Sequence, residues 1–125
     1  MKKVLISKIG LDGHEVGARI IVNLLLDNGF KVEYLGIRQT IDDILAKAES
    51  FRPDAIGISI MTGAHNFFIP KLRKALDTKK LKSIKLICGG LIPQKDIKPL
   101  MKYADAVFDN NSKLDDILKY FKECI

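Results

Sequence analysis

The chain has 125 residues and a formal net charge of +6, and its composition is 47% hydrophobic and 29% charged. This balance predicts one packed domain over residues 1–125, and no apolar run reaches the ~20 residues of a membrane span. The lysines are scattered and the few aromatic residues do not interleave with them, so we expect no nucleic-acid partner. The start does not resemble a signal peptide, and Cys88 and Cys124 fit reduced thiols, so we expect a cytoplasmic protein.

Short apolar runs alternate with stretches of helical periodicity along the whole chain. Residues 31–36 alternate polar and apolar, as in a strand near a sheet edge, whereas residues 55–60 are apolar on both faces, as in a central parallel strand. The predicted strands are residues 3–7, 31–36, 55–60, 85–88 and 106–108. The predicted helices are residues 15–27, 41–51, 65–78 and 93–103, and a last helix after Ser112.

Local signals predict where helices begin and which of their sides face inward. Thr40 is a predicted N-cap with Asp43 three residues later, and Ser112 is a predicted N-cap with Asp115 in the same relation. The residues expected on the inward side of the first helix are Val16, Ile20, Val22, Leu24 and Leu25. Those expected on the inward side of the last helix are Ile117, Leu118 and Phe121.

Five strands that alternate with five helices predict an α/β fold, a doubly wound parallel sheet with helices on both faces. Of the two common strand orders, five such units favour the flavodoxin-like (Rossmann-like) order 2-1-3-4-5. Ligands of this fold bind beyond the carboxyl ends of the strands, at the switch between the first and third strands. The loops expected there are residues 8–17, residues 59–65, and Gly89 with Gly90.

The sequence disfavours three usual ligands of such folds. The glycines of the first loop lack the dinucleotide-binding spacing, and no carboxylate follows the second strand to bind a ribose. The same loop holds no hydroxyl side chain, which disfavours a phosphate loop of the flavodoxin type. The third strand ends in Ser59, Met61 and Thr62, without the aspartate of a phosphotransfer domain.

The first loop instead holds groups that suit metal ligation. His14 has the carboxylate of Asp12 two residues before it and the ammonium of Lys8 six residues before it. A carboxylate can hold one nitrogen of a histidine while the other nitrogen binds a metal. Asp12, His14 and His65 could also form a simple site of two histidines and a carboxylate. The alternative for each residue is local: a surface histidine, a turn aspartate and a histidine that packs at a helix start.

Three separated motifs together resemble the signature of cobalamin-binding domains of the methionine synthase and mutase group. They are Asp12-x-His14-x-x-Gly17, Ser59-x-Met61 and Gly89-Gly90, and the likeness covers almost the whole chain. Residues 8–14, together with residues 36–40 and 59–65, are most similar to the small subunit or C-terminal domain of methylmalonyl-CoA mutase and other acyl-CoA mutases. The turn at residues 109–112 departs from the Gly-Pro-Gly-Thr-like turn that is common in relatives.

The resemblance implies roles for individual residues. His14 would be the lower axial ligand of cobalt, Asp12 would accept a hydrogen bond from its other nitrogen, and Lys8 would extend this relay. The displaced nucleotide tail would enter a slot between sheet and helices, where Ser59 would hydrogen-bond the benzimidazole and glycines would leave room. The implied cofactor-binding residues are Lys8, Asp12, Gly13, His14, Gly17, Ser59, Met61, Thr62, Gly63, Gly89 and Gly90.

The resemblance also implies an activity and a partner. The chain would be the adenosylcobalamin-binding small subunit of an acyl-CoA mutase, and a large catalytic subunit would bind the acyl-CoA and carry out the radical rearrangement. Alone, the chain would be a binding module without turnover, and no membrane partner is expected. The alternative is a stand-alone cobalamin carrier, a sensor or a methyl-transfer module that uses the same pocket.

Overall fold

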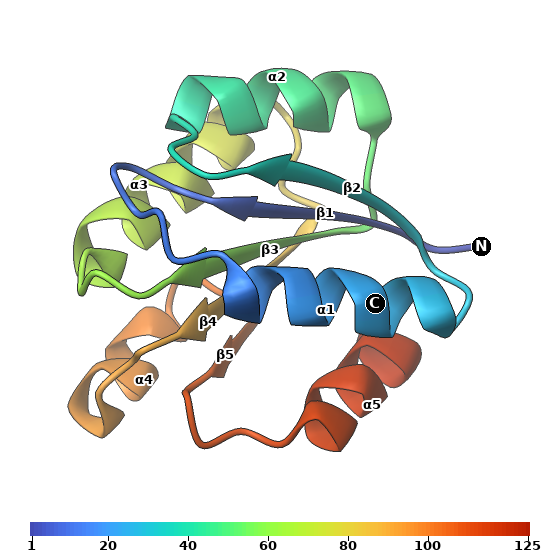
Figure 1. The fold of residues 1–125 in the computed structure, drawn as a ribbon. Coiled ribbons are helices and arrows are strands. Elements are labelled where there is room, and N and C mark those ends of the chain that lie inside the picture. Colours follow the sequence, from blue (N-terminus) through green and yellow to red (C-terminus); the bar gives the residue numbers. More distant parts are fainter.

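A computed structural model describes all residues, 1–125, as a five-stranded parallel sheet of order β2-β1-β3-β4-β5 with five helices (Figure 1). This order and the alternation of strands and helices confirm the predicted doubly wound fold. The strands are β1 (Lys3–Lys8), β2 (Lys31–Gly36), β3 (Ala55–Ile60), β4 (Lys85–Gly90) and β5 (Ala106–Phe108). The helices are α1 (Val16–Asp27), α2 (Ile41–Phe51), α3 (His65–Thr78), α4 (Gln94–Leu100) and α5 (Leu114–Cys124).

The helices cover the two faces of the sheet unequally (Figure 1). On one face α2, α3 and α4 pack on the sheet around a core that includes Ile44, Leu72 and Leu86. On the other face α1 and α5 pack around a smaller core that includes Leu25 and Phe121. Since burial of apolar surface is the main force that holds such layers together, the α1–α5 face is the more weakly filled of the two.

The predicted strand positions agree with the sheet. β2 lies at one edge and is exposed or half-buried throughout, whereas β3 lies in the centre and is almost entirely buried. The predicted capping of α2 is also confirmed, because Thr40 Oγ1 accepts a hydrogen bond from the Asp43 N–H at 3.0 Å and Asp43 Oδ2 accepts one from the Thr40 N–H at 2.9 Å. This reciprocal pair satisfies backbone donors that the helix itself leaves free.

Most predicted element boundaries agree with the structure within one residue, and two differ by more than that. β4 does not end at Cys88 but continues through both glycines, with Gly89 paired with Ser59 and Gly90 paired with Ile60. Gly90 has a φ of +127°, and a Cβ there would collide with the carbonyl oxygen of Ile60, so only glycine lets the two strands stay this close. The fourth helix ends at Leu100, and the residues up to 104 continue as hydrogen-bonded turns.

The predicted N-cap of the last helix is also wrong. Lys113 holds the cap position of α5 and makes no side-chain cap. Ser112 instead belongs to the preceding turn, where its hydroxyl donates to Asp109 Oδ1 at 3.2 Å. The same carboxylate oxygen accepts from the Asn111 N–H at 2.9 Å, so Asp109 organises this turn and takes the hydroxyl away from the helix.

The predicted inward side of α1 is only partly confirmed. Leu25 is fully buried, but Val16 is 76% exposed and Ile20 is 45% exposed. The small residue Ala18 is buried in their place. Ile20 therefore faces a space between the helices that the core residues do not fill.

No helix of the chain is both long and apolar enough to cross a membrane.

The two cysteines are expected to differ in reactivity. Burial raises the pKa of the Cys88 thiol to about 12, whereas Cys124 is exposed. Because the thiolate is the reactive form, we expect an aromatic disulfide reagent to modify only Cys124 in the folded chain and both cysteines in urea. The control is Cys124→Ser, and rapid modification of that variant under native conditions would contradict the expectation.

Candidate functional site

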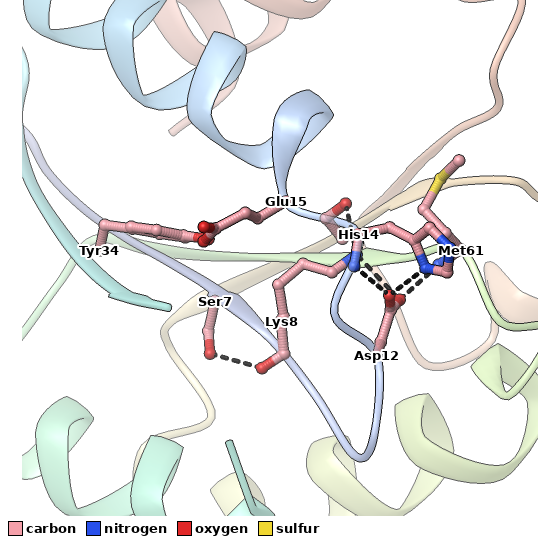
Figure 2. Close-up of polar contacts among 8 residues, drawn as sticks. Ser7, Lys8, Asp12, His14, Glu15, Tyr34 and Met61 are labelled. Atoms are coloured by element: carbon pink, nitrogen blue, oxygen red, sulfur yellow. Dashed lines mark hydrogen bonds and ion pairs between the residues drawn. The ribbon is translucent and has the colours of Figure 1, made fainter. Parts of the chain in front are cut away.

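The loop from Ile9 to Glu15 joins the end of β1 to the start of α1 at the carboxyl edge of the sheet (Figure 2). Lys8 is the last residue of β1, and its side chain is fully buried. The loop turns at Gly10, whose φ is +68° and whose N–H donates to the carbonyl of Gln39 at 2.9 Å. Asp12 follows within the same loop, and its side chain is also fully buried.

Asp12 connects three segments of the chain (Figure 2). Its Oδ1 accepts from the backbone N–H and from Nδ1 of His14, both at 3.0 Å. Its Oδ2 accepts from the Met61 N–H at 2.7 Å and pairs with Lys8 Nζ at 2.8 Å. Both carboxylate oxygens are thus fully used, and the carboxylate fixes the loop relative to the ends of β1 and β3.

These contacts also keep Asp12 charged. Burial by itself raises the pKa of this carboxyl group, but the hydrogen bonds from Lys8, Met61 and His14 outweigh burial and lower the pKa to about 2. Lys8 also donates to the hydroxyl of Ser59 at 3.3 Å. The buried ammonium therefore has a charged and a neutral partner, as a buried cation requires.

His14 is oriented but remains open to solvent. Its side chain is 71% exposed, while Nδ1 is bonded to the buried carboxylate of Asp12. An ionised carboxylate can only accept, so Nδ1 carries a proton, and in the neutral ring the lone pair is then on Nε2. A histidine whose one nitrogen is held by a carboxylate while the other is free is a prepared metal ligand.

A mostly apolar slot of about 270 Å³ opens beside this loop, between α1 and α5. The sheet forms its floor through residues that include Ile6, Gly57, Ser59 and Gly89. Its walls are formed by Ala18, Ile20 and Ile21 of α1 and by Leu114, Ile117 and Phe121 of α5. Met61 lines the slot and also donates to Asp12, so the slot and the His14 loop meet at this residue.

The B12 binding domain family matches residues 2–114 of the chain. The chain belongs to the B12-binding domain family. It is 32% identical over 100 residues to the 2-hydroxyisobutanoyl-CoA mutase small subunit of Aquincola tertiaricarbonis, a match that covers 80% of this chain and 74% of that one. It is 32% identical over 124 residues to the methylmalonyl-CoA mutase of Cereibacter sphaeroides, covering 98% of this chain but only 18% of the relative.

A solved structure shows the same fold as this B12-binding domain. It is a cobalamin-binding protein from Desulfitobacterium hafniense, with a TM-score of 0.85 and 23% sequence identity. The likeness covers 99% of this chain and 59% of the other. At this level of identity the comparison supports the fold and nothing finer.

The structure brings most of the predicted site residues together. Lys8, Asp12 and His14 form one hydrogen-bonded group, and Ser59 joins it through Lys8. The residues of the expected set that line the slot are Gly17, Ser59, Met61, Gly89 and Gly90. Gly13, Thr62 and Gly63 are exposed loop residues that do not line the slot, and their contribution stays a prediction.

Several residues of the slot were not predicted as site residues. Ile20 and Ile117 were assigned to the core, because helical periodicity identifies an apolar side but not what covers it. Asp109 and Asn110 also line the slot, so the turn that departs from the relatives still reaches this space. The sequence offered one signal for these slot residues, the long apolar side of α5. The neighbouring strand β5 has only three residues and is too short to cover that side.

The alternative of a simple metal site built from Asp12, His14 and His65 is wrong. No group of three histidine, cysteine or acidic side chains lies together in a way that could hold a metal ion. His65 is only 2% exposed, and its Nε2 lies 2.8 Å from Asp96 Oδ2 of α4. The hydrogen bond from His65 lowers the pKa of Asp96, and the pair joins α3 to α4.

Proposed function

We propose that this chain is the cobalamin-binding small subunit of an adenosylcobalamin-dependent acyl-CoA mutase, with His14 as the lower axial ligand of cobalt. The observation that carries the proposal is His14 itself, whose ring is 71% exposed while its Nδ1 is held by a fully buried carboxylate. Membership of the B12-binding domain family and the similarity to a mutase small subunit support it.

The residues of the site fit the cofactor chemically. His14 would offer Nε2 to cobalt, and the Asp12 carboxylate, kept charged by Lys8, would make that nitrogen a better donor. The slot is apolar and is lined by small residues such as Gly17, Ala18 and Gly57, which leaves space for a flat heteroaromatic tail. Ser59 lies on the slot floor and has a hydroxyl that could bond to such a tail.

Binding of the cofactor and enclosure of the substrate would be divided between two subunits. Adenosylcobalamin supplies an organic radical when its cobalt–carbon bond breaks, and such radicals must be kept from water. A domain that presents an open histidine on one edge of its sheet can hold and orient the cofactor, while a second protein surface is needed to enclose an acyl-CoA. A large catalytic subunit would therefore bind the substrate and cover the corrin, and the chain alone should show no turnover.

The proposal is tested by adding cobalamin to the uniformly ¹⁵N-labelled chain, reducing it to the cobalt(II) form and recording the electron paramagnetic resonance spectrum. A nitrogen ligand from the protein splits the cobalt lines into two, because ¹⁵N has spin one half, whereas the cofactor's own ¹⁴N base splits them into three. We expect twofold splitting in the wild type and its loss in His14→Ala. Threefold splitting in the wild type would show that His14 is not the ligand, and absence of binding would overturn the proposal.

A further inference from the structure

The His14 loop has a second attachment point that lies on the other side of the histidine from Asp12. Glu15 follows His14 directly and occupies the N-cap position of α1, but its carboxylate makes no capping bond to the helix. Glu15 Oε2 instead accepts a hydrogen bond from the hydroxyl of Tyr34 at 2.7 Å (Figure 2). The carboxylate of Glu15, which could cap α1, thus joins the loop to β2 instead.

Tyr34 is a fixed point for this bond. It lies in β2, in register with Ile6 of β1, so the sheet sets its backbone position. Burial, with a further contribution from Glu15, raises the pKa of Tyr34 to about 12, so the phenol keeps its proton and donates at neutral pH. Arg19 completes the cluster, since its Nε lies 3.4 Å from Glu15 Oε1 and its guanidinium lies 5.2 Å from the centre of the Tyr34 ring.

This cluster adds a side-chain anchor just after His14, where the backbone is otherwise held by the first turn of α1, in which the Arg19 N–H donates to the Glu15 carbonyl at 3.0 Å. Asp12 holds the backbone and the ring of His14, but Gly13 directly before the histidine gives the loop freedom to turn. The Tyr34–Glu15 bond removes that freedom at the residue next to the histidine. A ligand held from both sides loses less conformational entropy when it binds a metal.

We propose that Tyr34 is a positioning residue for His14, which acts through Glu15 and contacts neither the cobalt nor the corrin. This inference rests on the proposed function, because it assumes that His14 ligates cobalt. It predicts that loss of the Tyr34 hydroxyl weakens ligation by His14 and leaves the slot between α1 and α5 unchanged.

The test uses cobinamide, a corrinoid that lacks the nucleotide tail, so that its affinity reports histidine ligation without a contribution from the slot. We expect Tyr34→Phe to weaken cobinamide binding about fivefold, which is the effect of one hydrogen bond to a charged group after partial compensation. Glu15→Ala should have a similar effect, while Glu15→Gln should retain most of the affinity because its amide oxygen still accepts. The matched control is Tyr103→Phe, since Tyr103 is 41% exposed and its hydroxyl makes no hydrogen bond.

A double-mutant cycle separates positioning from a general structural effect. In the His14→Ala background, Tyr34→Phe should have no further effect on cobinamide affinity, because the residue that it positions is gone. If Tyr34→Phe lowered cobinamide affinity equally in both backgrounds, or in neither, the inference would be overturned. The proposed function would still stand in that case, provided that His14 ligates cobalt in the wild type. Absence of any effect of His14→Ala itself would remove the proposed function and this inference together.

Discussion

Replacing Asp12 by asparagine is expected to destabilise the folded chain by about 3–5 kcal/mol, the usual effect of removing one partner of a buried ion pair. Lys8 and Asp12 both have fully buried side chains, and their charged atoms lie 2.8 Å apart. Asparagine would leave the Lys8 ammonium without a counter-charge. Each carboxylate oxygen of Asp12 accepts two bonds, and asparagine would replace one of these acceptors by an NH₂ group, which can only donate.

Urea unfolding at several pH values measures this effect and its sign. The pKa of Asp12 is 3.8 in its ordinary state and about 2 in the folded chain, so folding favours the ionised form. The stability that this shift supplies is fully present above pH ~4 and is lost as the pH falls toward 2. We therefore expect the difference between wild type and Asp12→Asn to shrink as the pH is lowered over that range.

Two control variants make the test specific to the buried pair. Asp42→Asn removes an exposed carboxylate of α2 and should change the free energy of unfolding by only a few tenths of a kcal/mol. Lys8→Met combined with Asp12→Asn removes both charges and should recover much of the loss, because the methionine can be buried without a partner. If the double variant is as unstable as the two single losses added together, the two charges are not coupled as the structure indicates.

Replacing Gly17 by leucine is expected to weaken cobalamin binding by at least about tenfold without a loss of stability. Gly17 lines the slot, and a Cβ built there meets no atom within 4 Å, so a larger side chain has room in the folded chain and would extend into the slot. Leucine also has a higher helix propensity than glycine by ~0.8 kcal/mol. Stability and binding should thus change in opposite directions, which a general folding defect cannot produce.

Cobinamide again distinguishes the slot from the histidine. We expect Gly17→Leu to leave cobinamide affinity nearly unchanged, because the tail that needs the slot is absent, and Gly17→Ala to weaken cobalamin binding much less than leucine does. Thermal unfolding of the free chain serves as the stability control. Equal weakening of cobalamin and cobinamide would show that the slot does not hold the tail.

The fold could be predicted because local patterns and general packing rules agree along this chain. Thr40 and Asp43 form their capping pair from side chains three residues apart, which depends on nothing distant. The edge position of β2 and the central position of β3 follow from whether each strand is apolar on one face or on two. The order of the sheet then follows from the few ways in which such units can be connected.

Predictions were wrong where another group competes for a side chain, or where nothing in the fold covers an apolar side. Ser112 looks like a helix cap, but Asp109 takes its hydroxyl in the preceding turn. Val16 and Ile20 lie on an apolar side of α1, yet that side faces solvent or the slot. The Glu15–Tyr34 bond joins residues that are 19 positions apart and of ordinary types, so no local pattern indicates it. The group of Lys8, Asp12 and His14 was predictable because its members have unusual chemistry and lie close together in the sequence.

The position of the slot walls in the chain affects how stable the fold is when the slot is empty. They belong to α1 and α5, the first and last helices, and α5 has a single fully buried residue, Phe121, with Ile117 only half-covered. An occupant of the slot would cover these side chains and hold α1 and α5 together. Without an occupant, α5 should open more readily than the rest of the fold and be cut there first by a protease, and an occupant should slow that cleavage.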